Sequence, residues 1–163
     1  MALPGPHTSP VTDVPQEVAY RRRTPDIDGI IYSSLGEIYI HTQRIPEAAA
    51  AINRASKANP SKAGFYLRNE TILFFGIGDA ENQLKSAESA IDADPASAAP
   101  YYFQGMALAS KATVDPTTKK PILPPGCVEA YSKYPELDPN GQFSAEARSF
   151  PAEASKAGPT KAF

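Results

Sequence analysis

The chain has 163 residues, of which 42% are hydrophobic and 21% charged, so it is long enough to form one domain with a core. Its net charge of −2 gives no electrostatic basis for binding nucleic acid or an anionic membrane surface. Cys127 is the only cysteine, which excludes an intrachain disulfide, and no apolar run approaches the roughly 20 residues that cross a bilayer.

Residues 1–24 form a proline-rich segment that precedes the first helical pattern. Four prolines fall among the first 15 residues without any apolar period, which predicts an extended arm. The opening stretch, MALPGPHTSP, lacks the basic and apolar regions of a signal peptide, so none is expected. In this context Thr8, Ser9 and Thr12 are candidate sites for O-linked sugar.

The arm ends in the basic run Arg21–Arg23. The simpler interpretation of this run is a solvated charge cluster. The alternative is a docking contact for an acidic surface on a neighbouring molecule. Thr24 and Pro25 follow as a helix start, with threonine at the N-cap and proline at the first helical position.

Residues 25–60 contain two helical patterns joined by a short turn. Within YSSLGEIYIHTQRIPEAAAAINRASKANP, which begins at Tyr32, a large residue precedes Leu-Gly, then an aromatic, alanines around a bulky residue, and a closing proline. Gly36, Ala48 and Ala55 are the small residues that would let two antiparallel helices approach closely. The spacing resembles a tetratricopeptide (TPR) repeat, and one such pair cannot bury its apolar face alone, so further units are expected.

Two further units follow in the chain. The three units are predicted over residues 25–60, 61–95 and 96–139, with an insertion at 112–125, a capping helix at about 141–156 and a tail at 157–163. The second unit is the weakest by motif, since Thr71 and Gln83 stand where the first has Gly36 and Ala48. The insertion is predicted to be a loop or a small hairpin.

The last helix of the third unit is predicted to bury Cys127, Tyr131 and Tyr134. Pro135 should bend or end that helix, because proline lacks the backbone donor. The expected fold is therefore all-α: an α-solenoid of three TPR helical hairpins with a C-terminal capping helix and an extended proline-rich N-terminal arm.

The third unit, YYFQGMALASKATVDPTTKKPILPPGCVEAYSKYPELDPNG, resembles the C-terminal unit of secreted TPR proteins of acidobacteria and related soil and freshwater bacteria. Shared features are Gly-x-x-Leu-x-x-Lys-Ala-Thr, a loop to Pro-Pro-Gly, Glu-Ala with an aromatic, and a closing Asp-Pro-Asn-Gly. The resemblance covers about residues 25–150, although Pro135 replaces the usual leucine and the arm stands in place of the family's signal and β-sandwich domain. It implies a scaffold without assigned chemistry, and it favours an extracellular or periplasmic location while leaving a cytoplasmic one open.

The sequence offers no pattern for catalysis or metal binding. His7 and His41 are its only histidines, and with one cysteine they make no zinc cluster. Neither a glycine-rich phosphate loop nor a nucleophile elbow is present. We therefore expect no enzymatic activity and no cofactor. Cys127 is predicted to be a packed thiol, and Asn69 begins a glycosylation sequon that lies within a predicted helix.

In TPR folds one face of the first helix of each unit lines a concave groove for extended or helical segments. The corresponding residues here are Ile30, Ser33, Glu37, Ile40 and His41, then Phe65, Arg68, Ile72 and Phe75, then Tyr102, Met106 and Ala109. An alternative interpretation is that several of them pack beneath the capping helix. The lysine and asparagine set that holds C-terminal carboxylates in chaperone-binding TPR proteins is absent, so a chaperone tail is not the expected ligand.

Two hypotheses for function follow. The first is a non-catalytic scaffold that self-assembles head to tail into a filament or other homopolymer, through its stacked ends and its N-terminal arm. The second is a monomeric adaptor that binds a peptide or protein segment in the groove. Both imply a protein partner, which is another copy of the chain or a different protein, and neither implies nucleic acid or membrane insertion.

Overall fold

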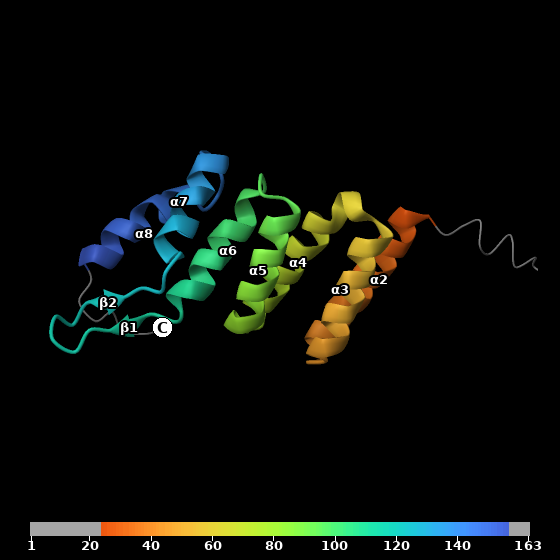
Figure 1. Ribbon diagram of the computed structural model, residues 1–163, viewed down its shortest axis with the longest axis horizontal. Coiled ribbons are helices and arrows are strands. Elements are labelled where there is room, and N and C mark those ends of the chain that lie inside the picture. Colours follow the sequence, from red (N-terminus) through yellow and green to blue (C-terminus); the bar gives the residue numbers. More distant parts are fainter. Residues whose placement is uncertain (1–23, 157–163) are drawn as a thin grey trace, which may run out of the picture.

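The computed structural model describes residues 24–156, and this part of the chain is mostly helical, as predicted (Figure 1). The arm residues 1–23, with Thr8, Ser9 and Thr12, and the tail 157–163 lie outside the described residues. The helices are α2 (Pro25–His41), α3 (Ile45–Ala58), α4 (Ala63–Gly76), α5 (Ala80–Ala93), α6 (Ala98–Ala109), α7 (Cys127–Leu137) and α8 (Ser144–Lys156). The 3-10 turn η1 (Pro60–Lys62) and the short strands β1 (Thr113–Val114) and β2 (Pro121–Ile122) complete the elements.

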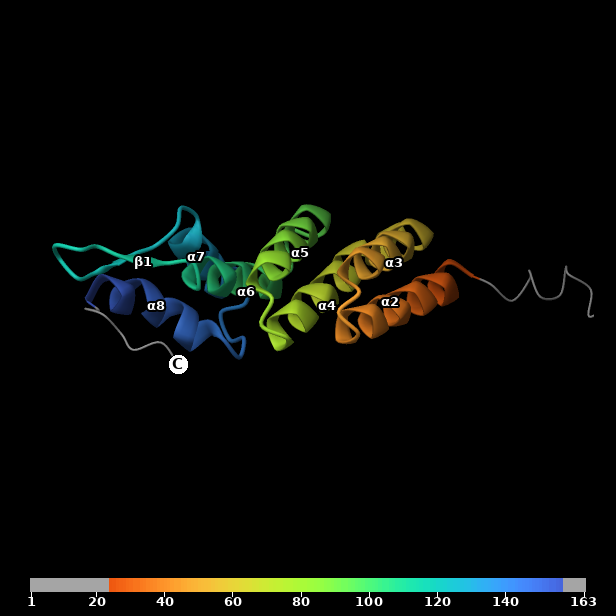
Figure 2. The ribbon, with the colours of Figure 1, turned by 90° about the horizontal axis from the view of Figure 1, so that it is seen from below.

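The helices contact one another mainly in sequence order. Helices α2 and α3, α4 and α5, and α6 and α7 pack as pairs, and the first helix of each later pair also contacts both helices of the pair before it. Helix α8 packs against α7. Figure 2 shows the result: α2, α4, α6 and α8 follow one another along one side of the molecule, and α3, α5 and α7 lie along the other.

Local sequence signals set the helix ends. The Thr24 hydroxyl accepts a hydrogen bond from the Ile27 amide at 3.2 Å, so it caps α2 ahead of Pro25. The Asp79 carboxylate caps α5 in the same way, accepting from the Asn82 amide at 3.0 Å. These side chains satisfy amides that have no partner in the first turn of a helix.

Glycine allows the close approach of helices in the first and third pairs. A Cβ atom at Gly36 would lie 2.7 Å from Cδ1 of Ile52, and one at Gly105 would lie 2.8 Å from Cδ2 of Tyr131. Both neighbours are buried side chains that cannot swing aside. Ala48 and Ala55 are fully buried, as the spacing of small residues predicted.

The second pair uses polar side chains where the first uses small ones. Gln83 is buried, and its Nε2 donates to the Phe103 carbonyl of α6 at 2.7 Å, so this side chain joins α5 to the next pair. The Thr71 hydroxyl is also buried and donates to the Leu67 carbonyl at 2.9 Å. The two polar side chains that depart from the predicted repeat motif are therefore hydrogen-bonded, which removes the cost of burying them.

Tyr66 of α4 packs the second pair of helices against the first. Its side chain is 1% exposed and packs with Ile52 and Ala55 of α3. On the other side it meets α2, where a Cβ atom at Gly29 would fall 2.9 Å from Cζ of the ring and closer still to the hydroxyl. The Tyr66 hydroxyl is buried and has no hydrogen-bond partner. The ring therefore fills a slot that only glycine leaves open.

The predicted insertion at 112–125 contains a small antiparallel hairpin. Thr113 pairs with Ile122, and Val114 with Pro121. The Asp115 carboxylate accepts from the amides of Thr117 and Thr118 at 2.7 and 2.8 Å and thereby closes the turn. Of the two alternatives left open by the sequence, the hairpin is the one observed.

An aromatic cluster joins α6, α7 and α8. The rings of Tyr102 and Phe143 stack with centroids 4.1 Å apart, and those of Tyr131 and Phe150 stack at 4.0 Å. Helix α7 continues to Leu137, two residues beyond Pro135, so the proline sits in the last turn rather than at a bend in the middle. Cys127, Tyr131 and Tyr134 are buried in this cluster, as predicted.

Candidate functional site

Four of the predicted groove residues expose apolar side chains. Ile30 of α2 and Phe65, Ile72 and Phe75 of α4 are between 42% and 56% exposed, and we call them the apolar row. Phe75 also meets the Phe103 ring of α6, with centroids 5.3 Å apart, so the row reaches the third pair. These residues lie on helices that follow one another along one side of the molecule (Figure 2).

Polar side chains accompany the apolar row. Arg68 places its guanidinium 5.0 Å from the centroid of the Phe65 ring, a cation–π distance. On the exposed face of α2, Nε2 of His41 lies 4.0 Å from Oε1 of Glu37. Ser33, Met106 and Ala109 are half-buried.

Ile40 and Tyr102 are not part of this accessible face, contrary to the prediction. Ile40 is fully buried against Ala48 and Phe74, because α4 packs over that turn of α2. Tyr102 is 3% exposed because the Phe143 ring covers it. Packing at the C-terminal end was the alternative that the sequence left open, and for Tyr102 it is what the structure shows.

The remaining candidate residues show no site of their own. Asn69 is half-buried in the middle of α4, and its sugar attachment stays a prediction. Cys127 is fully buried, and this burial raises the pKa of its thiol to about 11, as expected of a packed side chain. Over residues 24–156, no group of three or more histidine, cysteine or acidic side chains is placed to hold a metal ion.

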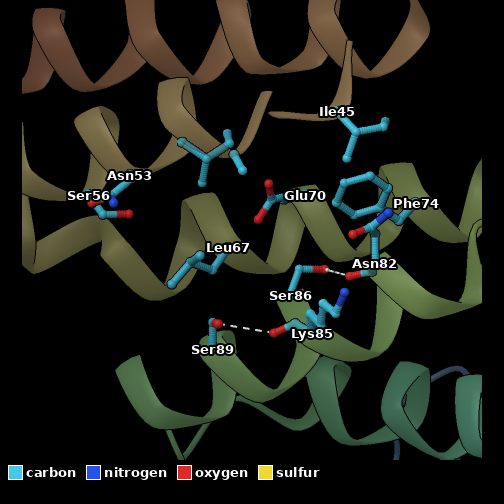
Figure 3. A pocket seen from close by; sticks show the side chains of 12 residues that line it. Ile45, Asn53, Ser56, Leu67, Glu70, Phe74, Asn82, Lys85, Ser86 and Ser89 are labelled. Carbon is cyan, nitrogen blue, oxygen red and sulfur yellow. Dashed lines mark hydrogen bonds between the residues drawn. The ribbon is translucent and has the colours of Figure 1, made fainter. Parts of the chain in front are cut away.

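A pocket of about 360 Å³ lies on the other side of α4, between α3 and α5 (Figure 3). Apolar and uncharged polar side chains make up most of its wall. The lining residues are Ile45, Ala49, Ile52, Asn53 and Ser56 of α3, Leu67, Glu70 and Phe74 of α4, and Asn82, Lys85, Ser86 and Ser89 of α5. Glu70 points into the middle of this space (Figure 3).

Glu70 is the unusual member of the pocket. It is only 6% exposed, and none of the described residues forms a hydrogen bond or ion pair with it. Burial disfavours the charged form and raises the pKa of this carboxyl to about 7. The side chain therefore changes charge near neutral pH.

The polar neighbours of Glu70 are turned towards other partners. The Lys85 ammonium pairs with Glu81 at 2.7 Å outside the pocket. The Ser86 and Ser89 hydroxyls donate to the carbonyls of Asn82 and Lys85 at 3.0 Å each. On the α3 side, the Ser56 hydroxyl is buried without any hydrogen-bond partner. Two buried polar groups of the pocket, the Glu70 carboxyl and the Ser56 hydroxyl, thus make no hydrogen bond to the described residues.

The sequence does contain a signal for this pocket, which the motif analysis missed. Tyr66, Glu70 and Phe74 are spaced four residues apart, so they share one helical face. An acidic residue between two aromatics on a buried face is unusual, because carboxylates are almost never fully buried without a partner. The predicted TPR spacing aligns Thr71, the residue next to Glu70, with Gly36 and assigns no role to Glu70.

No protein-family model matches the chain, and the comparison with curated proteins finds no significant match. Among the helices of residues 24–156, none combines the length and the apolar composition that a membrane crossing requires.

Replacing Glu70 with glutamine should flatten the pH dependence of stability. The folded-state pKa of about 7 lies above the unfolded value of 4.5, so the folded state binds the proton more tightly. The contribution of Glu70 to the free energy of unfolding is fully present below about pH 4.5. It is lost as pH rises through about 7, and the loss is roughly 3 kcal/mol. In urea unfolding at pH 5 and pH 8, Glu70→Gln should remove most of this difference. Glu88→Gln, at an exposed position on α5, is the matched control and should follow the wild type; equal pH dependence in both variants would contradict the assignment.

Proposed function

We propose that the chain is a non-catalytic protein-interaction scaffold built as a TPR-type solenoid. Its support is the sequential packing of helix pairs and the glycine contacts at Gly36 and Gly105, which match the small positions of the repeat. Stacked helix pairs present long continuous faces, and such faces typically bind segments of other proteins.

The apolar row is the observation that carries this proposal. Single apolar side chains are common on a protein surface, but three of these four share one face of α4, and all four are about half exposed. A bound segment that presents apolar side chains at helical spacing would cover them. Arg68, which lies on Phe65 within the row, adds a preference for an acidic group beside those apolar side chains.

Selection of peptides from a random displayed library on the full chain tests this proposal. Enriched peptides should combine apolar residues at helical spacing with an acidic residue. Phe65→Ser and Ile72→Ser should each weaken their binding about tenfold or more, because each removes the burial of one large apolar side chain. Ile122→Ser on the hairpin, an equally exposed apolar position, is the control and should bind normally. If both variants of the apolar row bind the selected peptides as tightly as the wild type, the proposal is wrong.

Self-association is a second candidate function, favoured by the outer side of α2. Ile27, Ile31 and Ile38 are between 42% and 57% exposed, and we call them the α2 stripe. Beside it is a second pocket of about 210 Å³ between α2 and α3. It is lined by Tyr32, Leu35, Tyr39, Glu47, Ala50, Ala51 and Arg54. Within residues 24–156, no helix pair precedes α2 to cover this end of the row (Figure 1).

The two ends differ in chemistry, which bears on the geometry of such an assembly. Among the side chains that the structure describes, those of Glu146 and Arg148 are exposed on α8, whereas α2 exposes the three isoleucines of its stripe. An apolar surface pairs best with another apolar surface, so two α2 stripes suit each other better than α2 suits α8. We infer a two-fold contact, which closes as a dimer, in preference to the head-to-tail filament predicted from the sequence.

Light scattering of the full chain over a range of concentrations tests this second candidate. A dimer is expected, and Ile31→Ser combined with Ile38→Ser should convert it to a monomer by removing the apolar contact. Val128→Ser on α7 is the control at another exposed apolar position. A wild-type monomer at high concentration, or a dimer that persists in the double variant, would rule out the α2 contact. Particles that grow into filaments with concentration would instead favour the head-to-tail arrangement.

A further inference from the structure

We propose that the pocket between α3 and α5 receives the cationic side chain of an arginine or lysine from a partner polypeptide, with the Glu70 carboxylate as its counter-ion. This site lies on the opposite side of α4 from the apolar row, since residues 65, 72 and 75 share one face of the helix and residue 70 falls on the other. The inference goes beyond the proposed function, because the site would stand even if the apolar row bound nothing.

Geometry supports the proposal first. Glu70 is more than nine-tenths buried, has no partner among the described residues, and points into an open space of about 360 Å³ (Figure 3). That space is large enough for the end of one long side chain. The apolar side chains of Ile45, Leu67 and Phe74 also line this space, and they suit the methylene stem of such a side chain.

The distribution of charge points to a cation as the ligand. Among the residues that line the pocket, Glu70 and Lys85 are the only charged ones. Lys85 is held at the rim by Glu81, at 2.7 Å, and its side chain is 64% exposed, so its charge faces solvent. Inside the pocket only the negative charge of Glu70 is left, and an anionic ligand would meet this charge without compensation.

Hydrogen-bonding capacity fits a cationic head that donates several bonds. A guanidinium or ammonium group carries donors and no acceptor. The Glu70 oxygens can accept, and the Ser56 hydroxyl, which is buried without a partner, offers a further acceptor on the α3 wall. The amide oxygen of Asn53, also on α3, is a third acceptor of the lining. A ligand with donors at its tip would use groups that the protein itself leaves unpaired.

Binding of a cation must also depend on pH. The ligand pairs with the ionised carboxylate, so it should lower the pKa of Glu70 from its free value of about 7. By linkage, affinity should rise roughly tenfold between pH 6 and pH 8, as Glu70 goes from mostly protonated to mostly ionised. Lys85 is the one other titratable group in the lining, and lysine keeps its charge across this range.

The probe is a blocked pentapeptide, acetyl-Ala-Ala-Arg-Ala-Ala-amide, titrated into the full chain while the Glu70 carboxyl carbon is followed by NMR. The peptide should lower the pKa of Glu70 by at least one unit and shift the amide signals of Asn53, Ser56 and Asn82. The same peptide with citrulline in place of arginine has the same shape without the charge, and it should do neither. Glu70→Gln should abolish binding of the arginine peptide, and Glu88→Gln should leave it unchanged.

Four results would overturn the proposal. One is an arginine peptide that leaves the Glu70 signal unmoved, and another is equal binding of the citrulline peptide, which would make the pocket a site for neutral hydrogen-bonding groups. The third comes from a chain in which Arg21–Arg23 are changed to glutamine. If the Glu70 pKa rises to about 7 only in that variant, the occupant is the chain's own basic run and not a partner. Signal changes confined to the apolar row would support the proposed function while contradicting this site.

Discussion

The packing of Tyr66 against Gly29 is the contact on which the rest of the arrangement depends. The ring enters from α4, lies against Ile52 and Ala55 of α3, and fits on the other side only because α2 has no Cβ atom at Gly29. This one side chain therefore fixes α4 against both helices of the first pair. Glycine costs stability within a helix, and here that cost is offset by burial of a large aromatic ring.

The position of Glu70 follows from the same constraint. Helical periodicity places it on the face that carries Tyr66 and Phe74, and both aromatics are buried against the first pair. Once they are packed, Glu70 cannot turn to bulk solvent, and it enters the pocket between α3 and α5. Its raised pKa and its lack of a partner are thus consequences of how α4 is anchored. Side chains on the opposite face of α4, among them Phe65 and Ile72, remain about half exposed for the same reason.

The sequence predicted the elements well because their signals are local. The Thr24 hydroxyl starts α2 through a hydrogen bond within one turn, directly before Pro25. The glycine and alanine spacing of the first unit marks where two helices touch. Ile40 and Tyr102 were misplaced because their burial depends on residues far along the chain, Phe74 and Phe143. The pocket was missed because it needs three helices at once, although the Tyr66, Glu70, Phe74 spacing signalled an unusual carboxyl.

A double-mutant cycle of Gly29→Ala and Tyr66→Phe, followed by urea unfolding, tests the central contact most directly. Gly29→Ala should destabilise the wild type by roughly 1–3 kcal/mol through overpacking. In the Tyr66→Phe background it should cost less, because the hydroxyl nearest to the new methyl group is gone, with a coupling of about 0.5 kcal/mol or more. Gly76→Ala, where an added Cβ meets nothing within 4 Å, is the control and should not destabilise. Strictly additive effects, or a Gly29→Ala variant as stable as the wild type, would show that Tyr66 does not hold α4 in place.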